Sequence, residues 1–160
     1  MSDAAALLAA LQQKGWTLSV AESLTGGALS SALVAVPGAS ASLFGAVVAY
    51  ATPVKHSLLG VDAALLAAHG PVHPLVAEQM ADGVRRAVAV DGRAADVGIS
   101  TTGVAGPDSP DGQPVGTVNV GVVTPSARTS FSFVFEGDRA GIRRQSVEAA
   151  LLATFGLVAE

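Results

Sequence analysis

The regular exchange of short apolar runs with segments of helical character most constrains the fold of this chain. Apolar runs at 16–21, 45–51 and 96–102 predict three buried strands, the second of them buried on both faces. Two more strands, at 115–123 and 129–135, are separated by a short turn, which favours an antiparallel hairpin. Because hairpin strands cannot be parallel, the pattern predicts an α/β fold: a layered α/β/α domain with a mixed sheet that includes a C-terminal antiparallel hairpin.

Capping and stop signals bound the helices between these strands. Gly15 ends the first helix, and Gly60 ends a helix that begins at Thr52-Pro53, with Thr52 as its cap. Thr25 is a candidate N-cap for a helix over 26–36. Further helices are expected over 62–68, 74–90 and 139–158, the last of them capped by Gly137-Asp138.

Length and composition predict one domain with an aliphatic core. The 160 residues suit a single domain over 1–160 that buries a substantial core. Half of the residues are hydrophobic but only 4% are aromatic, so the core must consist of Ala, Val and Leu side chains. Such small side chains favour helices that pack closely on a Val-rich sheet.

The same composition argues against several classes of function. A formal net charge of −4, without a basic patch, argues against nucleic acid as a partner. The absence of cysteine excludes disulfides and thiolate chemistry, and Glu22, Asp108 and Asp111 lack a recognisable metal spacing, so neither a metal nor a cofactor is expected. The N-terminus lacks a basic leader, and no apolar run approaches the roughly 18 residues of a membrane span. We therefore expect a cytoplasmic protein without a membrane partner.

Residues with chemical potential follow the first three predicted strands. Ser23 ends the first, Tyr50 and Lys55 follow the second, and the hydroxyl- and glycine-rich segment 101–107 ends the third. Parallel strands bring their carboxyl ends to one rim, so these segments are expected to converge. Lys55 falls in the first turn of the helix predicted to begin at Thr52-Pro53, where the helix dipole and partial burial disfavour its positive charge. Such a lysine suits the role of general base for Ser23. The alternatives are a capped turn at Ser23, a solvated Lys55 and a core aromatic at Tyr50.

Two arginines near the start of the last helix suggest an anion site. Arg139 and Arg143 are four residues apart and share one helix face. Together with the helix N-terminus they form a plausible phosphate receptor. The alternative is a solvent-facing pair balanced by Glu136 and Glu148.

Six motifs follow one another along the chain: segments 21–27, 36–40, Tyr50 with Lys55 and 58–61, 102–107, 114–118 and 137–139. Taken in this order, they resemble the CinA C-terminal domain family, the nicotinamide-nucleotide amidohydrolases. The resemblance extends from about residue 4 to about residue 158 and implies hydrolysis of the amide of nicotinamide mononucleotide to nicotinic acid mononucleotide and ammonia. It also implies a domain that forms a homo-oligomer. The family often has Cys where this chain has Leu24, which argues against a need for a thiol there.

The resemblance and the strand-end pattern together give a site hypothesis with a nucleotide as the small-molecule substrate. Ser23 attacks the carboxamide, Lys55 takes its proton, and Tyr50 orients Lys55 or relays the proton. Backbone N–H groups of Thr25, Gly26 and Gly27 are expected to stabilise the oxyanion. The remaining substrate contacts are expected from Thr52, Thr102, Gly103 and Gly106, with Arg139 and Arg143 at the phosphate.

Three alternatives stay open at this point. Water can attack the amide directly, with Ser23 only positioning it. The chain can instead be a catalytically weak nucleotide-binding or interaction module related to competence- and damage-inducible proteins. A pyrophosphatase acting on ADP-ribose is the weakest alternative, because the sequence offers no acidic metal cluster.

Overall fold

The computed structural model describes residues 1–110 and 112–160 and contains one mixed sheet of five strands. The strand order is β2-β1-β3-β4-β5. β1 is parallel to both β2 and β3, whereas β4 is antiparallel to β3 and β5. The predicted mixed sheet with a C-terminal hairpin is therefore confirmed. The strands are β1 Leu18–Glu22, β2 Leu43–Val48, β3 Val97–Gly103, β4 Thr117–Val123 and β5 Arg128–Val134.

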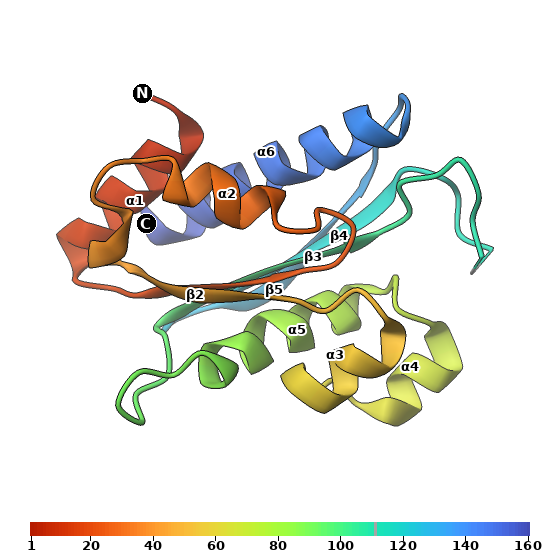
Figure 1. The fold of residues 1–160 in the computed structure, drawn as a ribbon, viewed down its shortest axis with the longest axis horizontal. Coiled ribbons are helices and arrows are strands. Elements are labelled where there is room, and N and C mark those ends of the chain that lie inside the picture. The colour runs from red at the N-terminus through yellow and green to blue at the C-terminus, as the bar shows by residue number, and fades with distance from the viewer. Residues whose placement is uncertain (111) are drawn as a thin grey trace.

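Helices cover both faces of this sheet, as the layered α/β/α prediction requires. α1, α2 and α6 lie on one face, and α3, α4 and α5 lie on the other (Figure 1). α5 runs along the sheet beneath β1, β3 and β4. The helices are α1 Asp3–Lys14, α2 Ala28–Val34, α3 Thr52–Leu59, α4 Ala63–His69, α5 Pro74–Ala87 and α6 Arg139–Val158, with a 3₁₀ turn at Ala39–Ala41.

Several helix ends follow the local signals in the sequence. Gly15 and Gly60 adopt left-handed conformations, with φ of 66° and 69°, and end α1 and α3. The Asp138 side chain accepts a hydrogen bond from the Gly141 N–H at 2.8 Å and caps α6. These three boundaries confirm the predictions.

Two capping predictions are wrong. α3 is capped by Ala51, and Thr52 is its first helical residue. α2 is capped by Gly27, whose φ of 106° suits a residue without Cβ, and the helix starts only at the next residue. Thr25 lies two residues before this cap, and its hydroxyl lies 2.8 Å from the Thr101 hydroxyl on β3.

The second strand also differs from its prediction. β2 begins and ends earlier than the expected 45–51, and its side chains are half-buried or exposed instead of buried on both faces. The reason is its place at the edge of the sheet, where it pairs with β1. An apolar run of small residues does not distinguish an edge strand from a central one.

The core divides into two aliphatic layers, one on each face of the sheet. Leu7, Leu11 and Ile142 belong to the layer under α1, α2 and α6, and Val76 and Met80 of α5 belong to the other. α5 packs against the backbone of the central strands at very short range. A Cβ built on Gly98 would lie 1.9 Å from the Ala81 carbonyl oxygen. Close packing of helix on sheet, expected from the aliphatic composition, is thereby confirmed.

Candidate active site

The carboxyl ends of three neighbouring parallel strands bring an alcohol and an amine together. Ser23 directly follows β1, Lys55 lies in the first turn of α3 just after β2, and Thr102 lies near the end of β3. The Lys55 Nζ donates a hydrogen bond to the Ser23 Oγ at 3.0 Å. The convergence expected from the strand pattern is therefore present in the structure.

Lys55 is buried, with 1% of its surface exposed, so it is not the solvated residue of the alternative interpretation. α3 begins at Thr52, three residues before Lys55, and the Lys55 side chain lies against the segment that connects β2 to α3. There the amine donates to the carbonyl oxygens of Ala49 at 2.7 Å and Tyr50 at 3.2 Å. These contacts hold the amine against the Ser23 hydroxyl.

A cavity of about 460 Å³ opens beside this pair. One wall of the cavity joins β3 to the connection between α4 and α5. There the Thr102 hydroxyl donates a hydrogen bond to the Pro71 carbonyl at 2.6 Å. The connection between β3 and β4 forms much of the remaining wall. The residues expected to bind substrate that line the cavity are Thr52, Thr102, Gly103, Gly106 and Arg139.

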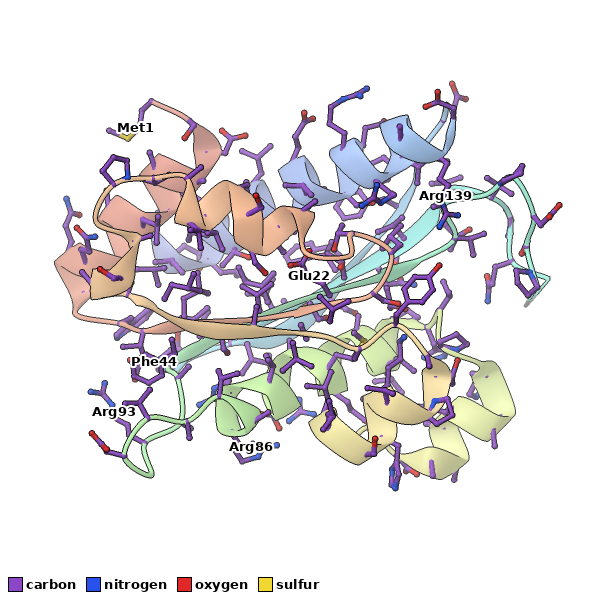
Figure 2. All side chains as sticks on the ribbon, in the orientation of Figure 1. Met1, Glu22, Phe44, Arg86, Arg93 and Arg139 are labelled. Atoms are coloured by element: carbon purple, nitrogen blue, oxygen red, sulfur yellow. The ribbon has the colours of Figure 1, made fainter. Side chains whose placement is uncertain are left out.

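Tyr50 and Arg139 meet at the mouth of the cavity. Arg139 donates from Nη1 to the Gly106 carbonyl at 2.8 Å, and its Nη2 lies 3.4 Å from the Tyr50 hydroxyl. The Tyr50 side chain is 62% exposed, which rules out the core-aromatic interpretation. Figure 2 shows Arg139 at the end of the molecule where the loop between β3 and β4 begins. Arg139 is thus placed to meet an anionic group of a bound molecule.

The turn after Ser23 is arranged differently from the oxyanion-site prediction. Thr25, Gly26 and Gly27 do not contribute to the lining of the Ser23 cavity. The Gly26 N–H donates to the Ser23 carbonyl at 3.1 Å within the turn itself. That donor is therefore not directed at a ligand, and the oxyanion role assigned to it from the sequence is corrected.

The two arginines of α6 also separate. Arg143 does not line the Ser23 cavity; it donates to the Leu24 carbonyl at 2.9 Å and to the Thr25 carbonyl at 3.1 Å. The shared phosphate receptor is corrected accordingly, since only Arg139 of the pair faces the cavity. Spacing along a helix predicts a common face but not which partners two long side chains reach.

Glu22 is a structural element of the site that the sequence reasoning missed. The side chain is fully buried between β1 and α2 (Figure 2). Its carboxylate accepts hydrogen bonds from the Leu29 N–H at 2.9 Å, from the Ser30 N–H at 3.0 Å and from the Ser30 hydroxyl. A carboxylate at a helix N-terminus compensates unpaired N–H groups and the helix dipole. The signal was an acidic residue at the end of an apolar run, one short turn before a helix.

Residues 1–110 and 112–160 lack the signatures of a metal centre and of a membrane span. In these ranges, no three His, Asp or Glu side chains are grouped as a metal ion would require. The same part of the chain contains no helix whose length and hydropathy would suit a membrane span. Asp111, named in the sequence analysis as a possible acidic ligand, lies outside the described residues.

Comparisons with known proteins agree on one family. The family model described as the CinA C-terminal domain matches residues 2–157. A CinA-like protein of Frankia casuarinae is 47% identical over 145 residues, 91% of this chain and 32% of that protein. A CinA-like protein of Anaeromyxobacter dehalogenans is 46% identical over 147 residues, 91% of this chain and 35% of that protein.

A solved structure has the same fold over nearly the same length. The competence damage-inducible protein A of Klebsiella pneumoniae superposes with a TM-score of 0.90 at 33% identity, and the match covers 99% of this chain and 96% of that one. By contrast, the chain spans about a third of the length of the curated relatives it matches. The Klebsiella structure therefore supports the fold over nearly the entire chain described above.

Proposed function

The chain belongs to the CinA C-terminal domain family, and we propose that it hydrolyses the carboxamide of nicotinamide mononucleotide to nicotinic acid mononucleotide and ammonia. One observation carries the proposal. A buried lysine amine lies 3.0 Å from a serine hydroxyl beside a cavity. Serine–lysine pairs are an established alternative to the serine–histidine–aspartate arrangement for acyl transfer.

The contacts of Lys55 suit a general base. Two of its partners are carbonyl oxygens, which only accept hydrogen bonds. In the proposed reaction Lys55 acts as a neutral amine and accepts the proton of the Ser23 hydroxyl, which reverses the donation from Nζ to Oγ seen in the structure.

The reaction then proceeds in two balanced halves. Ser23 Oγ forms a bond to the amide carbon while its proton passes to Lys55, and the C–N bond breaks as Lys55 returns that proton to the departing nitrogen. Water next attacks the acyl carbon, Lys55 takes its proton, and the proton returns to Ser23 as the acid leaves. The hydroxyl of Thr52 is a candidate donor to the amide oxygen. The role of Tyr50 as an orienting group or proton relay is part of the same proposal.

The rest of the cavity suits the other parts of a nucleotide. Arg139 provides a guanidinium for the 5′-phosphate, to which arginine binds well through two parallel N–H groups. Thr102, Gly103 and Gly106 line the space between Arg139 and Ser23, where the ribose or the ring would lie. No cofactor is part of this mechanism.

The direct test is ammonia release from nicotinamide mononucleotide. Ser23→Ala and Lys55→Met should each lower kcat by about 10²- to 10⁴-fold, the usual contribution of a general base or nucleophile. Exposed Ser40→Ala and Lys14→Ala are matched controls and should keep the wild-type rate. Full activity of Ser23→Ala would exclude the serine as nucleophile and leave direct attack by water. Full activity of Lys55→Met would remove the proposed base.

The main alternative is a nucleotide-binding or interaction module without significant turnover. Binding of nicotinamide mononucleotide with no ammonia released by the wild-type protein would favour that module. Metal-dependent release of AMP from ADP-ribose would favour a pyrophosphatase instead.

Self-association as a homo-oligomer and a cytoplasmic location belong to the proposal as well. Sedimentation velocity of the purified chain tests the self-association.

A further inference from the structure

Arg143 connects the last helix of the chain to the turn that carries Ser23. Its Nε donates to the Leu24 carbonyl at 2.9 Å and its Nη2 donates to the Thr25 carbonyl at 3.1 Å. These are the two carbonyls that directly follow Ser23 in the sequence. More than a hundred residues of chain separate Arg143 from the turn, so the contact links distant parts of the fold.

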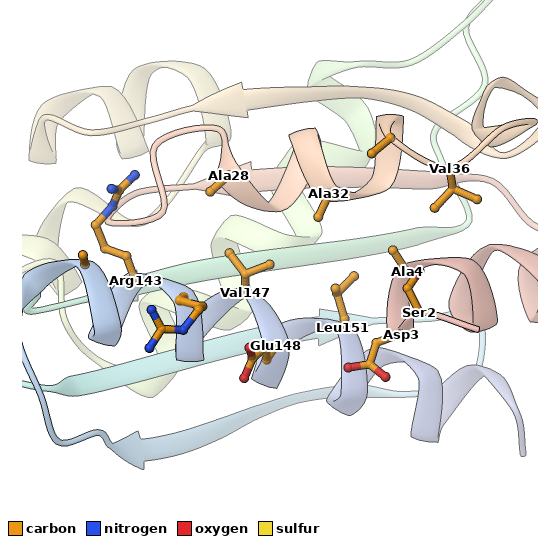
Figure 3. Close-up of a pocket in the computed structure, with 13 residues that line it drawn as sticks. Ser2, Asp3, Ala4, Ala28, Ala32, Val36, Arg143, Val147, Glu148 and Leu151 are labelled. Atoms are coloured by element: carbon orange, nitrogen blue, oxygen red, sulfur yellow. The ribbon is translucent and has the colours of Figure 1, made fainter.

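We propose that Arg143 is a positioning residue that fixes the Ser23 hydroxyl for attack and that it does not bind the substrate phosphate. The inference rests on the proposed amide hydrolysis. Its first support is location: Arg143 lies outside the Ser23 cavity and lines a separate groove of about 640 Å³ between α2 and α6. Figure 3 shows its side chain at one end of this groove, reaching toward the chain that enters α2.

The second support is the backbone of the turn. Gly26 has a φ of 57° and Gly27 a φ of 106°, so the turn contains two successive residues with left-handed backbone and no side chain of their own. A Cβ built on Gly26 would lie 3.6 Å from Arg143 Nη2, which places the guanidinium directly beside this backbone. The Arg143 side chain thus packs beside a turn whose glycines have no side chains, and it donates hydrogen bonds to two carbonyls of that turn.

The third support is the chemistry of the guanidinium. Its planar fork presents Nε and one Nη in fixed geometry, which matches two consecutive carbonyls. A lysine at position 143 has one nitrogen on a flexible stem and lacks the planar pair of nitrogens that donates the two bonds in this geometry. Leu24 is buried, so its carbonyl depends on protein donors within the fold.

A positioning role and a phosphate role predict different kinetics. Misplacing a reacting group by about 1 Å can cost about a hundredfold in rate without weakening substrate binding. Arg143→Ala should therefore lower kcat by about tenfold to a hundredfold and leave KM for nicotinamide mononucleotide nearly unchanged. A lost phosphate contact would instead raise KM and abolish the preference for the phosphorylated substrate.

The experiment compares Arg143→Ala, Arg143→Lys, Arg139→Ala and Arg144→Ala on nicotinamide mononucleotide and on the riboside that lacks the phosphate. Both Arg143 variants should lower kcat on both substrates and keep the wild-type ratio of their kcat/KM values. Arg139→Ala should lose most of that ratio. Arg144 is exposed on the same helix and its variant is the matched control, expected to behave as wild type. A collapse of the ratio in Arg143→Ala would overturn the proposal in favour of a phosphate ligand.

Amide hydrogen exchange provides a readout that does not need turnover. Exchange of the amides at 24–28 should become at least tenfold faster in Arg143→Ala and stay unchanged in Arg144→Ala. Should Arg143→Ala fail to fold, Arg143→Lys gives the same comparison with the charge retained. Wild-type exchange together with wild-type kcat in either Arg143 variant would overturn the positioning role. A wild-type protein that releases no ammonia would overturn the proposed function. Amide hydrogen exchange would still test whether Arg143 holds the turn after Ser23 in place.

Discussion

At the scale of single residues, some glycines of this chain allow a helix backbone to approach the sheet closely, while others allow turns. Gly98 of β3 and Gly121 of β4 face α5, and a Cβ built on Gly121 would lie 2.1 Å from the Ala77 carbonyl oxygen. The Ser100 hydroxyl also donates to this carbonyl at 2.5 Å. The absence of side chains lets the helix backbone rest almost directly on the sheet. This contact sets the height of α5 above the strands whose ends form the site.

A pair of glycine substitutions tests this packing. Gly98→Ala should lower the free energy of unfolding by about 1–3 kcal/mol, because its Cβ meets the backbone of α5 and one of the two must shift. Gly156→Ala is the matched control: it lies in α6, and no atom outside its own stretch of helix lies within 4 Å of its Cβ position. It should raise stability by roughly 0.5–1 kcal/mol through better helix propensity. Urea unfolding measures both. Equal effects of the two substitutions would mean that α5 does not pack as closely as described.

At the scale of elements, a carboxylate joins the beginnings of two central strands. Asp96, just before β3, accepts hydrogen bonds from the Thr17 N–H at 2.8 Å and the Thr17 hydroxyl at 2.9 Å, just before β1. Burial alone would raise the pKa of Asp96, but the bonds from Thr17 and the nearby Arg93 guanidinium lower it more, so the pKa lies below its ordinary value of 3.8. The folded protein therefore favours the charged carboxylate.

The pH dependence of Asp96→Asn follows from this shift. Since the pKa is lower in the folded than in the unfolded chain, the stabilisation is complete above about pH 4 and is lost as the pH falls through the folded-state value. At pH 7 the variant should melt about 2–4 °C below wild type, as a loss of about 1 kcal/mol gives in a chain of this size. The gap should narrow below about pH 4. Asp91→Asn, in the exposed turn before β3, should show no gap at any pH.

Elements also mark the division between what the sequence predicted and what it did not. The ends of α1, α3 and α6 follow from Gly15, Gly60 and Asp138, because a cap is decided within a few residues of chain. The exposure of β2 depends on its position in the sheet, which no local pattern encodes. For the same reason the contact of Arg143 with the turn after Ser23, 119 residues away in the sequence, could not be predicted. The proximity of Ser23 and Lys55 could be predicted, because each follows a predicted parallel strand and the carboxyl ends of parallel strands meet at one edge of the sheet.

At the scale of the whole molecule, the cavity depends on segments from both halves of the chain. Ser23 and Lys55 come from the parallel half of the sheet, whereas Arg139 comes from the helix that follows the antiparallel hairpin. Arg139 closes this arrangement by bonding to Gly106 across the cavity mouth. A ligand that engages both halves should therefore stabilise the entire fold, since it binds the folded chain and not the unfolded one.

Ligand-induced stabilisation tests that coupling without turnover. In Ser23→Ala, nicotinamide mononucleotide at a hundred times its Kd should add about 2.7 kcal/mol of stability and raise the melting temperature by about 5–10 °C. Adding Arg139→Ala should remove most of this rise at the same ligand concentration, because the phosphate loses its guanidinium partner. Adding Arg144→Ala instead should leave the rise intact, since Arg144 lies exposed on α6 away from the cavity. Equal rises in the two double variants would show that the nucleotide binds without Arg139, and that the two halves of the chain are not joined through its phosphate.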